Sequence, residues 1–90
     1  MDTQNTSEQT QLMIDYVAHE VIRRPGITIT QDSPLVTSGL IDSLALVNIL
    51  QKLEDVTQLR IQAGRVQPKD MDTVALMMAT AQRVGKPRRK

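Results

Sequence analysis

The sequence predicts an all-α fold, a small three- to four-helix bundle with a long loop between its first and second helices. Three segments carry apolar residues at positions i, i+3, i+4 and i+7, the spacing that gathers them on one face of a helix. Glycine and proline separate these segments, and 90 residues suffice for one domain only. We expect this domain at residues 7–84, between a disordered N-terminus at 1–6 and a disordered basic tail at 85–90.

The first helix is expected over residues 7–24. Thr6 and Gln9 have the spacing of a capping box, in which each side chain binds a backbone N–H of the other residue. The apolar stripe of this helix consists of Ile14, Val17, Ala18 and Val21. The helix should stop at Pro25-Gly26, because proline has no N–H to donate and its ring clashes with the preceding turn.

The second helix is expected to begin at Asp42 or Ser43 and to end near Val56. Its apolar stripe consists of Leu46, Ile49, Leu50 and Leu53. Aspartate and serine are favoured at the start of a helix, because their side-chain oxygens accept the backbone N–H groups of the first turn. The boundary between the preceding loop and this helix is therefore predicted from local sequence alone.

The third helix is expected from about Asp72 to Val84, and either Asp72 or Thr73 can cap its start. Its apolar stripe consists of Val74, Met77, Met78 and Ala81. A short extra turn is predicted at residues 68–70, which begin with a proline, because proline suits the first position of a helix.

Two long connections, residues 25–41 and 57–71, join the helices. We expect their apolar residues to pack on the bundle: Leu35, Val36, Leu40, Ile41, Leu59, Ile61 and Val66. The segment Ile27–Thr30 alternates like a β-strand, but the sequence offers it no convincing partner, so an extended loop is predicted. Long ordered connections are unusual in a compact domain and are often functional.

The composition excludes several classes of site. The chain has no cysteine, which excludes disulfides, a thiol nucleophile and thiolate zinc sites. Its single histidine, His19, excludes a metal site of several histidines, and we interpret it as a surface residue. No apolar run approaches the roughly 18 residues of a membrane span, and the polar N-terminus lacks the pattern of a secretory signal. We therefore expect a cytoplasmic protein without enzymatic activity and without a membrane partner.

The net charge of +1 hides an uneven distribution of charges. Residues 1–84 hold seven basic and all ten acidic residues, a net charge of −3, whereas residues 86–90 hold four basic residues. A basic tail can bind nucleic acid, but four charges release few counterions. We therefore expect a solvated tail and no nucleic-acid partner.

The segment of residues 39–44, Gly-Leu-Ile-Asp-Ser-Leu, is the most informative part of the sequence. It places Ser43 at a helix N-terminus, where free N–H groups and the helix dipole stabilise an anion such as a phosphodiester. Asp42 can cap the helix, and it could also supply a carboxylate to a metal-dependent modifying enzyme. Leu44 and Val47 should be partly exposed beside Ser43, which suggests partner docking. Asp-Ser is also an ordinary helix cap, so these residues alone leave a purely structural role open.

From about residue 8 to residue 84 the chain resembles the acyl carrier and peptidyl carrier protein family. The triplet at residues 42–44, Asp-Ser-Leu, looks like the phosphopantetheine attachment motif of this family. Residues 32–39 are similar to the loop before the motif, and the Asp-Thr-Val at residues 72–74 is similar to the start of the last helix. The glycine lies four residues before the serine rather than three, and the second helix has few acidic residues. Both features are closer to stand-alone D-alanyl-type carriers or carriers of specialised metabolism than to fatty-acid-synthesis carriers.

The resemblance implies an acyl-carrier-protein-like bundle in which Ser43 bears 4′-phosphopantetheine as a covalent cofactor, with Asp42 beside it. A phosphopantetheinyl transferase would attach the cofactor, whose thiol would hold acyl or aminoacyl thioesters. An adenylating ligase would load the thiol, and synthases or transferases would act downstream, in a specialised pathway such as polyketide or nonribosomal peptide biosynthesis. The partner-binding residues implied on the second helix are Leu44, Val47, Asn48, Gln51, Glu54 and Asp55. Such a carrier is expected to be a monomer and to catalyse nothing itself.

Three other functions compete with this one. A helical protein-binding module without a cofactor would use the same exposed patch. A small nucleic-acid-binding protein would use Arg83 and the basic tail. A hydrolase would use Ser43 as its nucleophile, but the sequence shows no base for it, because His19 lies in another helix without a visible orienting group.

Overall fold

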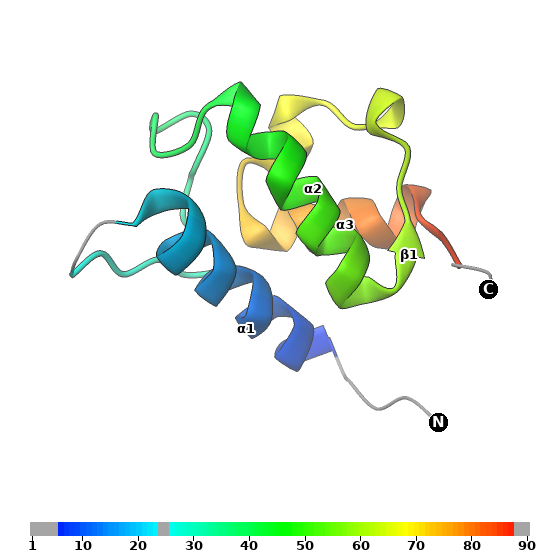
Figure 1. Cartoon of the computed structure of the whole chain (residues 1–90), viewed down its shortest axis with the longest axis horizontal. Helices are drawn as coiled ribbons and strands as arrows, with labels where there is room; N and C mark the ends of the chain where they lie inside the picture. Colours follow the sequence, from blue (N-terminus) through cyan, green and yellow to red (C-terminus); the bar gives the residue numbers. More distant parts are fainter. Residues whose placement is uncertain (1–5, 24–25, 88–90) are drawn as a thin grey trace.

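Three α-helices, a π-helix, two 3₁₀ turns and a two-stranded ribbon make up the computed structural model, which describes residues 6–23 and 26–87. Figure 1 shows the α-helices: α1 (Thr6–Tyr16), α2 (Ser43–Thr57) and α3 (Val74–Val84). The smaller elements are η1 (π-helix, Val17–Ile22), β1 (Leu59–Arg60), η2 (3₁₀, Ala63–Arg65), η3 (3₁₀, Pro68–Met71) and β2 (Lys86–Pro87). The predicted helical character is confirmed. Residues 1–5, part of the predicted disordered N-terminus, lie outside the described residues.

The first predicted helix is present, but its winding changes along its length. α1 begins at Thr6, the residue predicted to cap it, and η1 continues it after Tyr16 with wider turns. Arg23 has a left-handed conformation, with φ 60°, and donates its N–H to the carbonyl of Ala18 at 3.0 Å. This bond spans five residues, the spacing of a π-helix, and ends the helical segment. The predicted end at residues 24–25 lies outside the described residues.

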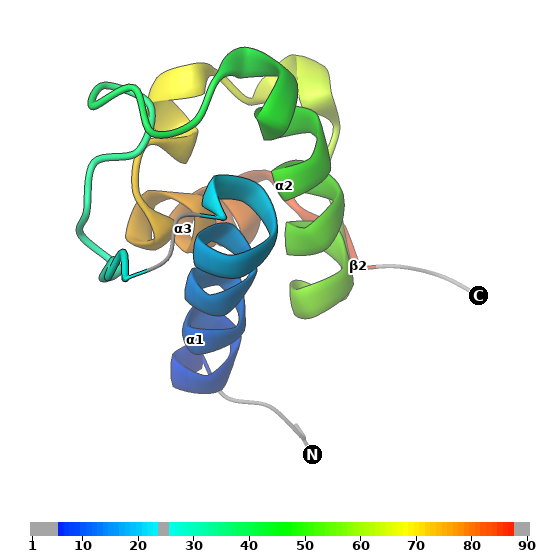
Figure 2. The same cartoon turned by 60° about the vertical axis from the view of Figure 1, so that its left-hand side comes forward.

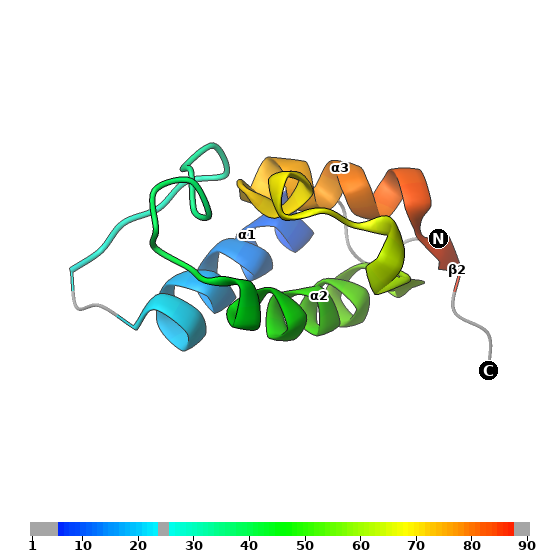
Figure 3. The same cartoon turned by 90° about the horizontal axis from the view of Figure 1, so that it is seen from above.

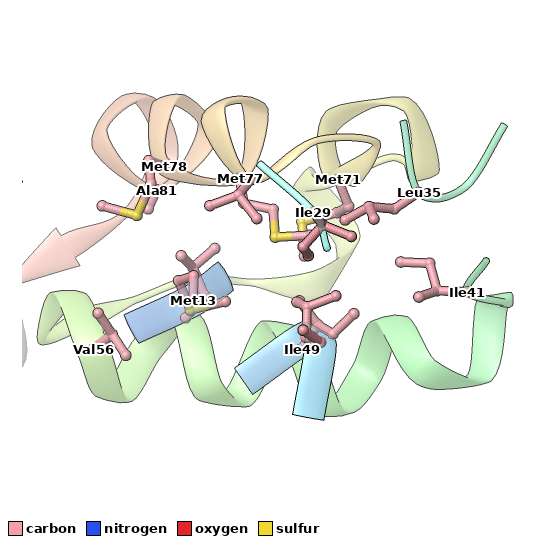
Figure 4. Close-up of a cluster of buried hydrophobic side chains, with 14 of the residues drawn as sticks. Met13, Ile29, Leu35, Ile41, Ile49, Val56, Met71, Met77, Met78 and Ala81 are labelled. Carbon is pink, nitrogen blue, oxygen red and sulfur yellow. The ribbon is translucent and has the colours of Figure 1, made fainter. Parts of the chain in front are cut away.

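The core lies where the three helices meet (Figure 2). Its buried apolar residues are Met13, Val17, Ala18, Ile29, Leu35, Ile41, Ile49, Leu53, Val56, Ile61, Met71, Val74, Met77, Met78 and Ala81. Figure 4 shows methionine side chains between α2 and α3. Because the chain has no phenylalanine or tryptophan, these flexible side chains fill the volume that aromatic rings occupy in other cores.

α2 and α3 pack against each other and begin at the same end of the molecule (Figures 1 and 3). The loop between η1 and α2 covers that end. Leu35 and Ile41 of this loop are buried in the core, near Met71, as predicted for this connection (Figure 4). The N–H of Ala75 donates to the carbonyl of Gln31 at 2.9 Å and ties the loop to α3. The start of α2 therefore lies at the same end of the molecule as this loop and the start of α3.

A two-stranded ribbon accompanies the helices of this mostly helical fold, and it includes residues 86–87 of the predicted tail. β1 and β2 pair antiparallel, with Arg60 opposite Lys86. Gly85 permits this arrangement, because a Cβ atom there would overlap the carbonyl oxygen of Ala81. The chain therefore leaves α3 packed closely against β1, and the last three residues of the tail lie outside the described residues.

The two connections are ordered where the structure describes them. η3 confirms the predicted extra turn, and the N–H of Gln67 donates to the carboxylate of Asp70 at 2.9 Å. The buried Thr80 of α3 donates its hydroxyl to the carbonyl of Asp70 at 3.3 Å, and Arg83 lies 3.7 Å from the carboxylate of that residue. These contacts hold the second connection on α3. In the first connection Ile27–Thr30 forms no strand, as predicted.

Candidate functional site

Ser43 is the first residue of α2, and it is exposed. Asp42 precedes it with extended backbone angles (φ −109°, ψ 178°), and its Oδ1 atom accepts the N–H of Ala45 at 2.9 Å. The predicted start and cap of this helix are therefore confirmed. Among the described residues no hydrogen-bond partner occupies the hydroxyl of Ser43, which leaves its oxygen accessible to a reaction partner.

The start of α2 favours a negative charge on the Ser43 side chain. The first turn of a helix leaves backbone N–H groups without partners inside the helix, and Asp42 accepts only that of Ala45. The N–H groups of Ser43 and Leu44 point out of the helix end, together with the positive end of the helix dipole. An anion at an exposed helix start is stabilised by about 0.3–1 kcal/mol.

The loop that leads to Ser43 is closed by hydrogen bonds of its own. The N–H of Ile41 donates to the carbonyl of Leu35 at 3.1 Å, and the N–H of Gly39 donates to the carbonyl of Val36 at 3.1 Å. Gly39 has φ 83°, in the left-handed region that glycine adopts without strain. Because Leu35 and Ile41 are both buried, the two ends of the loop are anchored in the core.

Asp72, just before α3, binds this loop through its carboxylate. Its Oδ1 atom accepts the N–H groups of Leu35, Val36 and Thr37 at 3.2, 2.8 and 2.9 Å. Its Oδ2 atom accepts the hydroxyl of Thr37 at 3.1 Å. These bonds, that of the Thr37 N–H first, lower the pKa of Asp72 below its ordinary value of 3.8 against the opposing effect of burial.

Sequence reasoning missed this role of Asp72, which was predicted only as one of two possible caps of the third helix. Thr73 is the cap, because its Oγ1 atom accepts the N–H of Leu76 at 3.0 Å. The partners of Asp72 precede it in the sequence by 35 to 37 positions, and no local pattern reveals contacts over such a separation. The one signal in the sequence is that two cap-type residues stand together where a helix needs only one.

An exposed face of α2 begins beside Ser43. Leu44 is 81% exposed and Val47 is 58% exposed, which confirms their predicted exposure. The other predicted partner-binding residues that are exposed on this helix are Asn48, Gln51 and Asp55. Two aliphatic side chains thus lie among polar ones next to Ser43. We call these five residues the α2 face.

Glu54 does not belong to the α2 face, although its exposure was predicted. Its side chain is partly buried, and its Oε2 atom accepts the N–H of Ile61 at 2.7 Å. Gln58 ends α2 in a left-handed conformation, with φ 61°, and the chain turns back so that Ile61 reaches the carboxylate. The exposure of Glu54 is therefore only partial, because its carboxylate binds a backbone N–H of the same chain.

A small apolar pocket of about 100 Å³ lies beside the α2 face. It is lined by Leu46, Val47, Leu50, Ala63, Val66, Gln67 and Met71. Leu46 and Val47 follow Ser43 by three and four residues, so the pocket lies on the same side of α2 as the serine. The sequence predicted that Val66 packs on the bundle, but the pocket itself depends on where η2 and η3 come to lie.

The part of the chain that the structure describes has no group of three or more histidine, cysteine, aspartate or glutamate residues placed to hold a metal ion. His19 is exposed on η1, as predicted, and no hydrogen bond joins it to Ser43 among these residues. No helix of residues 6–23 and 26–87 combines the length and the apolar character that a membrane crossing requires.

No protein-family model matches the chain, and neither the curated proteins nor the solved structures provide a match. Three features come together at the start of α2: the exposed Ser43, the loop bound by Asp72, and the apolar pocket beside Leu46 and Val47.

Proposed function

We propose that the chain is an acyl or aminoacyl carrier protein that bears 4′-phosphopantetheine on Ser43. One observation carries the proposal: Ser43 is the exposed first residue of α2, after the capping Asp42 and beside the exposed Leu44. This is the arrangement that the sequence resemblance implies for an attachment serine. The helical fold of the described residues is compatible with such a carrier.

The residues around Ser43 suit a phosphodiester. The hydroxyl oxygen of Ser43 would form the ester bond, and the N–H groups at the start of α2 would face the resulting negative charge. Asp42 keeps this helix end in place through its bond to Ala45. When attached, the group supplies the thiol for thioesters, which the cysteine-free chain itself lacks.

The α2 face is the surface that we propose for partner enzymes. These partners are a phosphopantetheinyl transferase, an adenylating ligase that loads the thiol, and synthases or transferases that act downstream. Leu44 would provide the central apolar contact, with Asn48 and Gln51 as its polar surroundings. Because Asp55 is the one acidic member of this face, electrostatic steering toward basic partners is weak. This favours a D-alanyl-type or specialised-metabolism carrier over a carrier of fatty-acid synthesis.

The pocket beside Ser43 supports a short acyl cargo. Its walls are almost entirely apolar, and its volume of about 100 Å³ is small. Met71 lines it, and a methionine side chain adapts its shape to what it contacts. A short aliphatic chain attached through Ser43 would find there an apolar surface to pack against.

The carrier proposal includes a monomeric chain in the cytoplasm that is not an enzyme and has no nucleic-acid or membrane partner. The alternative is a protein-binding module without a cofactor. The exposure of Leu44 and Val47 favours this alternative too, because contiguous exposed aliphatic side chains mark protein interaction sites. The two functions differ in what happens to the hydroxyl of Ser43.

An intact-mass measurement tests the proposal. The chain is incubated with coenzyme A and a phosphopantetheinyl transferase of broad specificity. We expect a gain of one phosphopantetheinyl group, which Ser43→Ala abolishes and Ser7→Ala, at another exposed serine, leaves unchanged. If the chain gains no mass while an established carrier in the same reaction does, the binding module is the better account.

A further inference from the structure

Asp72 makes an unusual set of bonds for a single carboxylate. It accepts the three consecutive backbone N–H groups of residues 35–37 and the hydroxyl of Thr37, all within 3.3 Å. The start of α3 does not require this side chain, because Thr73 caps the helix. The carboxylate therefore serves the loop, which lies far from it in sequence.

The loop links the position of Asp72 to the start of α2. Leu35 donates its N–H to the main-chain carbonyl of Asp72 at 2.7 Å, and it accepts the N–H of Ile41 through its own carbonyl at 3.1 Å. Ile41 is buried and lies two residues before Ser43. Because α2 and α3 begin at the same end of the molecule, these bonds connect the two helix starts (Figure 3).

We propose that Asp72 is a positioning residue for the modification of Ser43, an inference that rests on the proposed function. Its carboxylate holds residues 35–37 in one conformation, so the loop and the start of α2 present one preformed surface to the modifying enzyme. Without the carboxylate, the N–H groups of Val36 and Thr37 lose their acceptor, and the loop samples other conformations.

A mobile loop would change the binding of the modifying enzyme rather than its chemical step. The enzyme then binds only the fraction of chains whose loop is in place, and its KM rises by the inverse of that fraction. Ser43 itself remains at the start of α2. The cap of this helix, Asp42, binds Ala45 and takes no part in the hydrogen bonds between Asp72 and the loop. The rate constant kcat should therefore stay close to its original value.

The test combines transferase kinetics with amide hydrogen exchange on Asp72→Ala and Asp72→Asn. Alanine removes both acceptor oxygens, whereas asparagine retains one neutral acceptor. If the loop is in place in about one tenth of the Asp72→Ala chains, KM rises about tenfold and kcat changes by less than about twofold. Exchange at Val36 and Thr37 should accelerate in the same variant, and Asp72→Asn should give smaller effects of both kinds.

Asp70→Asn is the matched control. It removes a carboxylate two residues away that binds Gln67 and lies near Arg83 but does not contact the loop. We expect neither KM nor the exchange at residues 35–37 to change in this variant. Circular dichroism establishes that each variant is folded, and if Asp72→Ala is not, Asp72→Asn takes its place in the test.

Two results would overturn the positioning role. The first is unchanged exchange at residues 35–37 in the folded Asp72 variants, which would mean that the carboxylate does not hold the loop. The second is faster exchange with an unchanged KM, which would mean that the loop does not matter for modification. The wild-type chain separates failure of this inference from failure of the proposed function. If the wild-type chain gains no group, the proposed function fails as well. If it gains the group and either result above is found, only the positioning role fails.

Discussion

Substitution of Asp42 separates the structural and chemical roles of the residue before Ser43. Asp42→Ala removes the acceptor of the Ala45 N–H, which lies 2.9 Å from Oδ1, and also removes a negative charge from the positive end of the helix dipole. Loss of a cap costs about 1 kcal/mol, and loss of the charge costs about 0.3–1 kcal/mol. We therefore expect the free energy of unfolding to fall by about 1–2 kcal/mol. Asp42→Asn keeps an acceptor and should lose only the contribution of the charge.

Urea unfolding followed by far-UV circular dichroism measures these differences, since the chain has no tryptophan for fluorescence. An Asp42→Ala chain as stable as the wild type would refute the capping geometry. The same variants then enter the transferase assay. A rate that falls equally in Asp42→Ala and Asp42→Asn would show that the carboxylate acts on the modifying enzyme, whereas a loss confined to Asp42→Ala would show that the cap alone matters.

Three other contacts lead to measurable outcomes. Gly85→Ala should lower the free energy of unfolding, measured in urea, by about 1–3 kcal/mol, because the added Cβ overlaps the carbonyl oxygen of Ala81. Gly64→Ala is the control, since open space surrounds Gly64, and it should change this free energy by less than about 0.5 kcal/mol. Because the folded state lowers the pKa of Asp72 below 3.8, this carboxylate contributes stability above that pH, and the contribution is lost as the pH falls through the lowered pKa. Acid titration followed by circular dichroism should show that Asp72→Asn lacks this part of the loss. Leu44→Ser should leave the stability of the fold unchanged, because the side chain is 81% exposed. It should raise the transferase KM about tenfold or more, since burial of a leucine against the bound enzyme contributes about 1.5–3 kcal/mol.

The start of α2 was predictable because the information is local. Asp42 and Ala45 are three residues apart, and the apolar stripe that includes Ile49 and Leu53 fixes which side of the helix is buried. Once that side is fixed, the exposure of Leu44 and Val47 follows from the helical repeat. The same reasoning placed the extra turn at the proline of η3.

The contacts that were missed join segments far apart in sequence. Residues 59–60 pair with residues 86–87, and residues 35–37 bind Asp72. Glu54 was expected on the exposed partner surface because the family resemblance places it there, and the return of the chain at Ile61 partly buries its carboxylate. Propensity and periodicity describe one segment at a time, so they give no account of such pairs.

The attachment of one phosphopantetheinyl group to Ser43 is most directly tested by tandem mass spectrometry of the modified chain. The tryptic peptide that ends at Lys52 contains three serines, Ser33, Ser38 and Ser43. Fragment ions that include Ser43 but not Ser38 should carry the added group, and complementary ions that end at Ser38 should not. An unmodified peptide from a reaction in which an established carrier is modified, or a group located on Ser33 or Ser38, would contradict the account.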